Sequence, residues 1–157
     1  MITATPVVSP SQVLTHLRLS IPGVTGDNAD GTIEAYTYSS GVSCCGANGR
    51  ASFTPFTIQK GIDRASASLQ TALVQHTNFA SPELRVYMVD PATQAETLSY
   101  KVRLTNVHVT RHNPVFSTPM NVGAAREEVD FIYDVICWDY LTGGVTVTAC
   151  FNLATNN

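Results

Sequence analysis

Residues 56–79 read FTIQKGIDRASASLQTALVQHTNF, a strand pattern followed by a turn and one short helix pattern. The i, i+3, i+4, i+7 spacing of one helix face is occupied by Leu69, Ala72, Leu73 and His76. Ser66 is expected to cap the amino end, because its hydroxyl can accept an orphan backbone N–H. We therefore predict one helix over about residues 66–77, in which Asp63, Ser66, Leu69 and Leu73 serve capping and packing.

The surrounding chain carries strand patterns. About seven segments of alternating or β-branched residues are separated by turn signals, with no repeating strand–helix–strand unit. In residues 97–109 the apolar phase shifts between Leu104 and Val107, which predicts a β-bulge within one long strand. We expect a mainly β fold of antiparallel strands, a sandwich or a barrel, with one short helix.

The last two strand patterns supply the expected core. Residues 127–140, EEVDFIYDVICWDY, are apolar on both faces, which predicts one central strand covered on both sides. Its expected core residues are Phe131, Val135 and Trp138. Residues 143–153 begin within a TGG hairpin signal and alternate strictly from Val145 onward. The residues predicted to point inward there are Val145, Val147, Ala149, Phe151 and Leu153.

Composition excludes several classes of protein. The chain has 157 residues, which suits one domain, and 44% of them are hydrophobic, so disorder is not expected. Charged residues make up 13% and the net charge is −3, which gives no electrostatic reason to expect nucleic acid or an anionic membrane as a partner. A weakly charged surface also produces little electrostatic repulsion between copies of the chain, which favours self-association. The first residues lack the basic and apolar regions of a signal peptide, and no apolar run is long enough for a membrane helix.

Four cysteines are present: Cys44, Cys45, Cys137 and Cys150. Their spacing matches no zinc motif, so zinc is not expected. No cofactor of another kind is predicted. Cys137 and Cys150 lie in apolar strand patterns and are predicted to be small buried hydrophobic residues. A disulfide between the neighbours Cys44 and Cys45 stays open as an alternative.

Motifs for catalysis are absent from the sequence. It contains no nucleophile elbow, phosphate-binding loop or HExxH motif. His108 and His112 have the i, i+4 spacing that grips a metal on a helix, but on a strand their backbones stand about 13 Å apart. We therefore predict that the protein is not an enzyme and has no catalytic or metal-binding residues.

Five blocks occur in an order that resembles the haemolysin-coregulated protein (Hcp) family. They are LRLSIPGVTGD, TIEAYTYSSGVS, FTIQKGIDRASASLQTAL, TLSYKVRLTNVHV and EEVDFIYDVICWDY, within residues 13–141. The resemblance implies a compact β-barrel of two packed antiparallel sheets with one flanking helix. It also implies a single tube domain over residues 1–157, with residues 1–11 as a flexible segment.

The same resemblance implies a function in the bacterial type VI secretion system. Family members form homohexameric rings that stack into a tube, which meets a spike at its tip and a contractile sheath around it, and carries small effectors. They start in the cytoplasm and leave without a signal peptide. The matching contact loop here holds Gly41, Val42, Ser43, Cys44, Cys45, Gly46, Asn48 and Arg50.

Three other interpretations stay open. The chain could be a monomeric barrel that binds a small ligand, since small barrels can hold one. It could be a tube subunit of a related contractile injection machine. The third interpretation is a hydrolase whose motif is not recognisable.

Overall fold

The computed structural model describes residues 14–45, 49–116 and 125–155. One helix and eleven strands are assigned within these residues. Their bounds are β1 Leu14–Ser20, β2 Ile33–Ser39, β3 Val42–Ser43, β4 Ser52–Phe53, β5 Phe56–Gly61, α1 Ala65–Gln75, β6 Glu83–Val89, β7 Glu96–Thr105, β8 His108–Val115, β9 Arg126–Ile132, β10 Val135–Thr142 and β11 Val145–Asn152.

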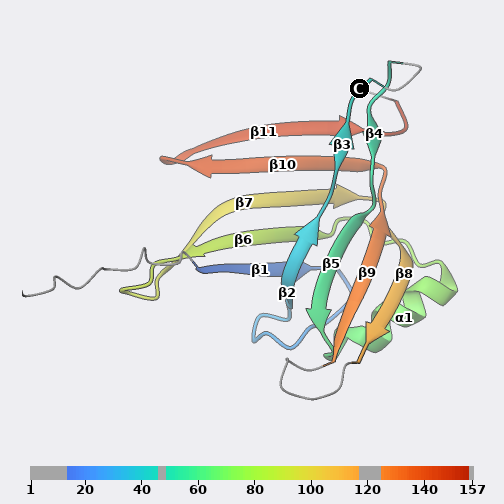
Figure 1. Ribbon diagram of the computed structural model, residues 1–157, viewed down its shortest axis with the longest axis horizontal. Coiled ribbons are helices and arrows are strands. Elements are labelled where there is room, and N and C mark those ends of the chain that lie inside the picture. The colour runs from blue at the N-terminus through green and yellow to red at the C-terminus, as the bar shows by residue number, and fades with distance from the viewer. Residues whose placement is uncertain (1–13, 46–48, 117–124, 156–157) are drawn as a thin grey trace, which may run out of the picture.

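Nine strands form one antiparallel sheet in the order β11-β10-β7-β6-β1-β2-β5-β9-β8, and β3 pairs with β4 as a separate small sheet. The two halves of the large sheet cross steeply where β1 meets β2 (Figure 1). The mainly β class with one short helix is confirmed. The predicted closed barrel is wrong, because β11 and β8 lie at opposite ends of the sheet order and do not pair.

Two long predicted strands are broken into two strands each, and both breaks are corners between the halves. Asn106 adopts a φ of 52° between β7 and β8, and its amide donates to Asp134 at 2.9 Å. Tyr133 and Asp134 separate β9 from β10. The phase shift after Leu104 therefore marks a corner, and the predicted bulge there is wrong. Bulges occur instead at 35/37, 86/87 and 109/111.

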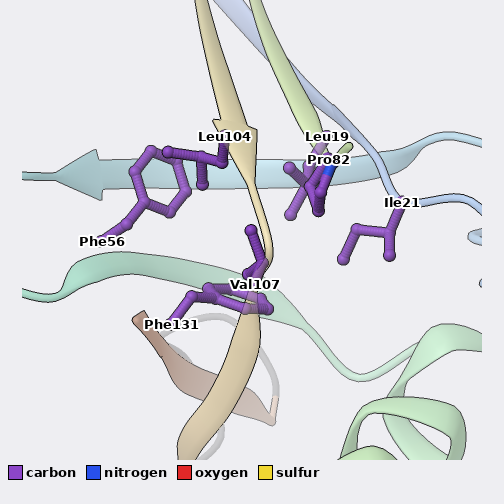
Figure 2. Close-up of a pocket in the computed structure, with 7 residues that line it drawn as sticks. All are labelled: Leu19, Ile21, Phe56, Pro82, Leu104, Val107 and Phe131. Carbon is purple, nitrogen blue, oxygen red and sulfur yellow. The ribbon is translucent and has the colours of Figure 1, made fainter. Parts of the chain in front are cut away.

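The core lies between the crossing halves. Figure 2 shows seven side chains that converge there, contributed by Leu19, Ile21, Phe56, Pro82, Leu104, Val107 and Phe131. Within this group, which lies wholly in the described chain, no room is left for a water molecule. Of the predicted core residues, Phe131 is 1% exposed, Val135 is half-buried, and Trp138 packs partly buried against the core.

Helix α1 lies beside β8 and covers one side of the core (Figure 1). Its buried residues are Ala65, Leu69 and Ala72, while Leu73 is only partly buried. Burying Leu69 stabilises the fold by about 1.5–3 kcal/mol. The helix ends at His76, an exposed left-handed C-cap, where the Thr77 N–H donates to the Ala72 carbonyl at 2.9 Å.

The prediction that Ser66 is the N-cap is wrong, because the helix begins one residue earlier and the cap position is Arg64, which makes no side-chain cap bond. Asp63 caps the helix instead, since its Oδ1 accepts the Ala65 N–H at 2.9 Å. Ser66 Oγ in turn accepts the Asp63 N–H at 3.0 Å. Asp63 and Ser66 thus fix the turn that leads into the helix.

Candidate assembly surface

Strand β11 is an edge strand that is exposed on both faces along most of its length. Val145 is 60% exposed and Val147 is 56% exposed, so the prediction that they point into the core is wrong. Only Phe151 and Leu153 pack partly against the core. The reason is visible in Figure 1, where the β10–β11 hairpin projects past the crossing half of the sheet. Among the described residues, nothing covers this apolar face or pairs with the outer edge of β11.

Two tyrosines extend this apolar face. Tyr140 pairs with Val147 on one side and with Tyr100 on the other, so all three share one face of the sheet. The Tyr100 and Tyr140 rings lie 5.0 Å apart, and Tyr140 is 51% exposed. We call Tyr100, Tyr140, Val145 and Val147 the aromatic overhang.

A cleft of about 290 Å³ joins the overhang to the base of the β3–β4 hairpin. Its lining is Tyr38, Ser40, Gly41, Val42, Phe53, Tyr100, Tyr133, Trp138 and Tyr140. Burial raises the pKa of the Tyr100 and Tyr133 hydroxyls. Both therefore stay neutral at physiological pH, and the cleft presents aromatic rings and uncharged hydroxyls.

The described part of the predicted contact loop includes β3, which pairs with β4, and this pair is fastened at its base. The Gly41 N–H donates to Thr54 Oγ1 at 2.7 Å, and the Thr54 N–H donates to the Gly41 carbonyl at 2.9 Å. Val42 is 57% exposed, and the exposed residues beyond it are Ser43, Cys44, Cys45 and Arg50. Gly46 and Asn48 lie outside the described residues. The loop's role in contacts between subunits stays a prediction.

All four cysteines are in disulfides, Cys44 with Cys45 and Cys137 with Cys150. The first is the alternative that the sequence left open. The second overturns the prediction that Cys137 and Cys150 are unpaired buried hydrophobic residues. They lie directly opposite each other on β10 and β11, with Cα atoms 4.1 Å apart. Their side of the sheet faces away from the core, because the neighbouring Ile136 points into it.

A buried ionic cluster joins the turn before α1 to the sheet. Lys60 is completely buried on β5, and its Nζ donates to Glu127 Oε1 on β9 at 2.5 Å and to Asp63 Oδ1 at 2.7 Å. Ser66 Oγ donates to the same Glu127 oxygen at 2.9 Å. His112 Nε2 on β8 lies 2.9 Å from the other oxygen, Glu127 Oε2. The cluster therefore connects three strands and the start of the helix.

This cluster is not predicted above, because its residues lack the spacings that are typical of catalysis. The available signal was the alternation of Phe56, Ile58 and Lys60, which places the lysine on the inward face. A lysine at an inward position needs a buried carboxylate partner. Lys60 is inaccessible, so the cluster fits a structural role.

A second ion pair, on the outer face, ties β11 to the sheet. Arg103 on β7 donates two hydrogen bonds to the buried Asp139 on β10, at 2.8 and 2.9 Å. Thr148 on β11 donates a third at 2.8 Å. The hydrogen bonds from Arg103 lower the pKa of Asp139 to about 2, from an ordinary 3.8.

This lowered pKa predicts a defined loss of stability in acid. A carboxyl group whose pKa is lowered by folding stabilises the protein above its unfolded-state pKa, and that contribution disappears as pH falls through the folded-state value. For Asp139 the window runs from about pH 4 down to about pH 2. Arg103→Met is expected to raise the pKa of Asp139 toward its unfolded-state value, so that less stability is lost between about pH 4 and about pH 2. It should also lower stability at pH 7 by about 1–3 kcal/mol.

Urea unfolding of the wild type and of Arg103→Met between pH 7 and pH 2 measures both effects. Arg85→Met is the control, because the carboxylate of its partner Glu83 is more exposed than that of Asp139. Identical pH profiles for Arg103→Met and the wild type would contradict the prediction.

Neither a metal centre nor a membrane helix is found in the described chain. Among residues 14–45, 49–116 and 125–155, no three His, Cys, Asp or Glu side chains are grouped so that they could hold a metal ion. In the part of the chain that the structure describes, no helix has both the length and the apolar character to cross a membrane.

Comparison with known proteins gives one family. The family model described as "Type VI secretion system effector, Hcp" matches residues 19–140. No curated protein matches the chain.

Several solved structures share the fold. Hcp1 from Salmonella typhimurium has 21% identity over 91% of this chain and 97% of that chain, with a TM-score of 0.78. A mutant form of Hcp1 from the E. coli EAEC 042 pathovar has 26% identity over 88% of this chain and 98% of that chain, with a TM-score of 0.73. A type VI secretion system effector from Yersinia pestis has 20% identity, covers 87% and 98%, and has a TM-score of 0.70.

Proposed function

Because the chain belongs to the Hcp family of type VI secretion proteins, we propose that it is a non-enzymatic structural subunit of the secretion system's inner tube. Copies of the chain form hexameric rings, the rings stack, and the tube carries effectors outward. In this role the subunit is made in the bacterial cytoplasm and is then secreted. Its partners are other copies of itself, the spike at the tube tip, the contractile sheath and small effector cargo.

The aromatic overhang is the observation that carries this proposal. Val145 and Val147 are each more than half exposed beside the half-exposed Tyr140, and all lie on the face that continues into the core. The free edge of β11 runs along the same place. A neighbouring copy that covers the overhang would also cover the edge of β11. The contact would therefore remove both an exposed apolar patch and an open strand edge from the single subunit.

Closure into a ring follows from the kind of contact. The overhang is at one end of the sheet order, while the free edge of β8 is at the other. A contact between two different patches is heterologous, and it produces a ring where the repeated rotation between copies closes. The weak net charge of −3 leaves little repulsion between copies.

The alternative of a small-ligand barrel finds less support. The core shown in Figure 2 is filled, so the interior offers no ligand cavity at that place. The aromatic cleft opens on the surface, beside the residues proposed for contact. A tube subunit of a related contractile machine would use the same overhang. Identifying the sheath and spike proteins that bind the chain would distinguish that alternative from the main proposal.

Size-exclusion chromatography with light scattering, followed by negative-stain microscopy, tests the proposal. We expect particles of about six times the chain mass of 16.9 kDa, seen as rings in projection. Dilution should release single subunits if the contact is reversible. A strict monomer at high protein concentration would contradict the proposed assembly.

A further inference from the structure

Edge strand β11 is held to the molecule unequally along its length. At its carboxyl end, the Phe151 ring stacks on Phe53 with centroids 4.6 Å apart, and the Leu153 N–H donates to the Asp134 carbonyl at 2.8 Å. Toward the hairpin tip, β10 is the one described strand that pairs with β11, which is exposed on both faces there. The outer part of β11 therefore depends on ladder hydrogen bonds to β10, on the hydrogen bond from Thr148 to Asp139, and on any covalent link between the two strands.

The Cys137–Cys150 disulfide joins the strands at the boundary between these two parts. It is the third residue pair from the anchored end, after Val135–Asn152 and Ile136–Phe151. Five pairs, from Trp138–Ala149 to Thr142–Val145, lie beyond it toward the tip. Val147 and Tyr140, the centre of the aromatic overhang, belong to those five pairs.

The disulfide is also accessible to small thiols. Cys137 is 9% exposed, but Cys150 lies on the exposed stretch of β11. The pair sits on the side of the sheet that faces away from the core, so a reagent reaches it without unfolding the core. Disulfides that can be reached by thiols respond to the redox state of the compartment.

We propose that the Cys137–Cys150 disulfide is a redox-operated clamp on edge strand β11, open in the reducing cytoplasm and closed after the protein reaches an oxidising environment. The closed clamp orders the outer part of β11 and so holds the aromatic overhang fixed against the neighbouring copy in tubes that were assembled with the clamp open. The clamp itself rests on the geometry of the single chain, while its effect on assembly rests on the proposed function.

The chemistry is exchange with a small-molecule disulfide, for which glutathione disulfide is the probe. The Cys150 thiolate attacks one sulfur of the reagent, forms a mixed disulfide and releases one thiolate. The Cys137 thiolate then attacks Cys150 Sγ and releases the second. The two protein thiols lose two protons and two electrons in total, and the reagent becomes two thiols. Dithiothreitol reverses the reaction by the same steps.

Hydrogen–deuterium exchange on the full chain tests the clamp. The oxidised protein, prepared with glutathione disulfide, is compared with protein reduced by dithiothreitol and with the double variant Cys137→Ser/Cys150→Ser. We expect the amides of residues 145–149 to exchange on the order of tenfold to a hundredfold faster in the reduced protein and in the variant. Without the disulfide, the segment between residues 137 and 150 gains more conformational entropy when it opens, so local opening costs less free energy. Amides of β5 and β9 should keep their protection in all forms.

Cys44→Ser/Cys45→Ser is the matched control, since it removes the other disulfide and leaves the clamp intact. Its β11 amides should be protected when oxidised and lose that protection with dithiothreitol. Equal exchange of residues 145–149 in oxidised and reduced wild type would overturn the clamp, whatever the variants do.

Light scattering on the same samples separates the two proposals. If β11 exchange depends on the redox state but neither form makes rings, the clamp stands and the tube function fails. If rings form equally in both states and β11 exchange is unchanged, the clamp fails and the tube function stands.

Discussion

Lys60→Met is expected to lower the free energy of unfolding by about 3–5 kcal/mol at pH 7. The substitution keeps most of the side-chain volume but removes the positive charge and its donors. Glu127 is 1% exposed and would keep a buried negative charge without the ammonium group that now lies 2.5 Å away. Asp63 would lose its partner as well, at a side-chain exposure of 11%. Urea denaturation of both proteins measures the difference.

The double variant Lys60→Met/Glu127→Gln is the informative control. It removes both charges of the strongest pair, so its loss of stability should be smaller than the sum of the two single losses. That non-additivity distinguishes a broken ion pair from poor packing of the new methionine. A loss below about 1 kcal/mol in Lys60→Met would mean that the cluster contributes little net stability.

Val147→Asp is expected to abolish ring formation while leaving the single subunit folded. Val147 is 56% exposed in the subunit, so a carboxylate there remains hydrated and should change subunit stability by less than about 1 kcal/mol. In the proposed ring the same carboxylate would be buried against an apolar neighbour. A buried and unpaired charge costs several kcal/mol, so association should weaken by at least about a hundredfold.

Light scattering measures the assembly of Val147→Asp, and thermal unfolding measures its fold. Thr146→Asp is the matched control, because Thr146 precedes Val147 on β11, is exposed, and points to the opposite face of the sheet. It adds the same charge outside the overhang and should leave rings intact. Intact rings in Val147→Asp would remove the overhang from the interface.

The helix could be predicted from sequence because its evidence is local. Leu69 and Ala72 repeat at helical spacing, and both are buried where α1 lies beside β8. The corners could not be predicted in the same way. The change of apolar phase after Leu104 is compatible with two structures: a β-bulge within one strand, or a corner at which the chain passes to the other half of the sheet. The left-handed backbone of Asn106 decides between these outcomes, and it depends on contacts such as the one with Asp134.

The Cys137–Cys150 pairing can be predicted from the sequence. The two-residue turn at Gly143 and Gly144 sets Thr142 opposite Val145, and five further steps along each arm bring Cys137 opposite Cys150. The hairpin signal predicts the turn, and the position of the two glycines within it fixes the register. The exposure of Val147 cannot be predicted from the sequence, because alternation identifies the two faces of a strand but does not show which face another element covers.

The placement of β9 between β5 and β8 has a consequence for how the chain reaches its native state. Lys60 and Glu127 are 67 residues apart in the sequence, and they meet only through the pairing of β5 with β9. During synthesis, the half-made chain therefore carries a lysine whose burial must wait until residue 127 has left the ribosome. Such long-range pairings slow the search for the native topology. Until β9 is made, the edge of β5 that will pair with it stays open to other nascent chains.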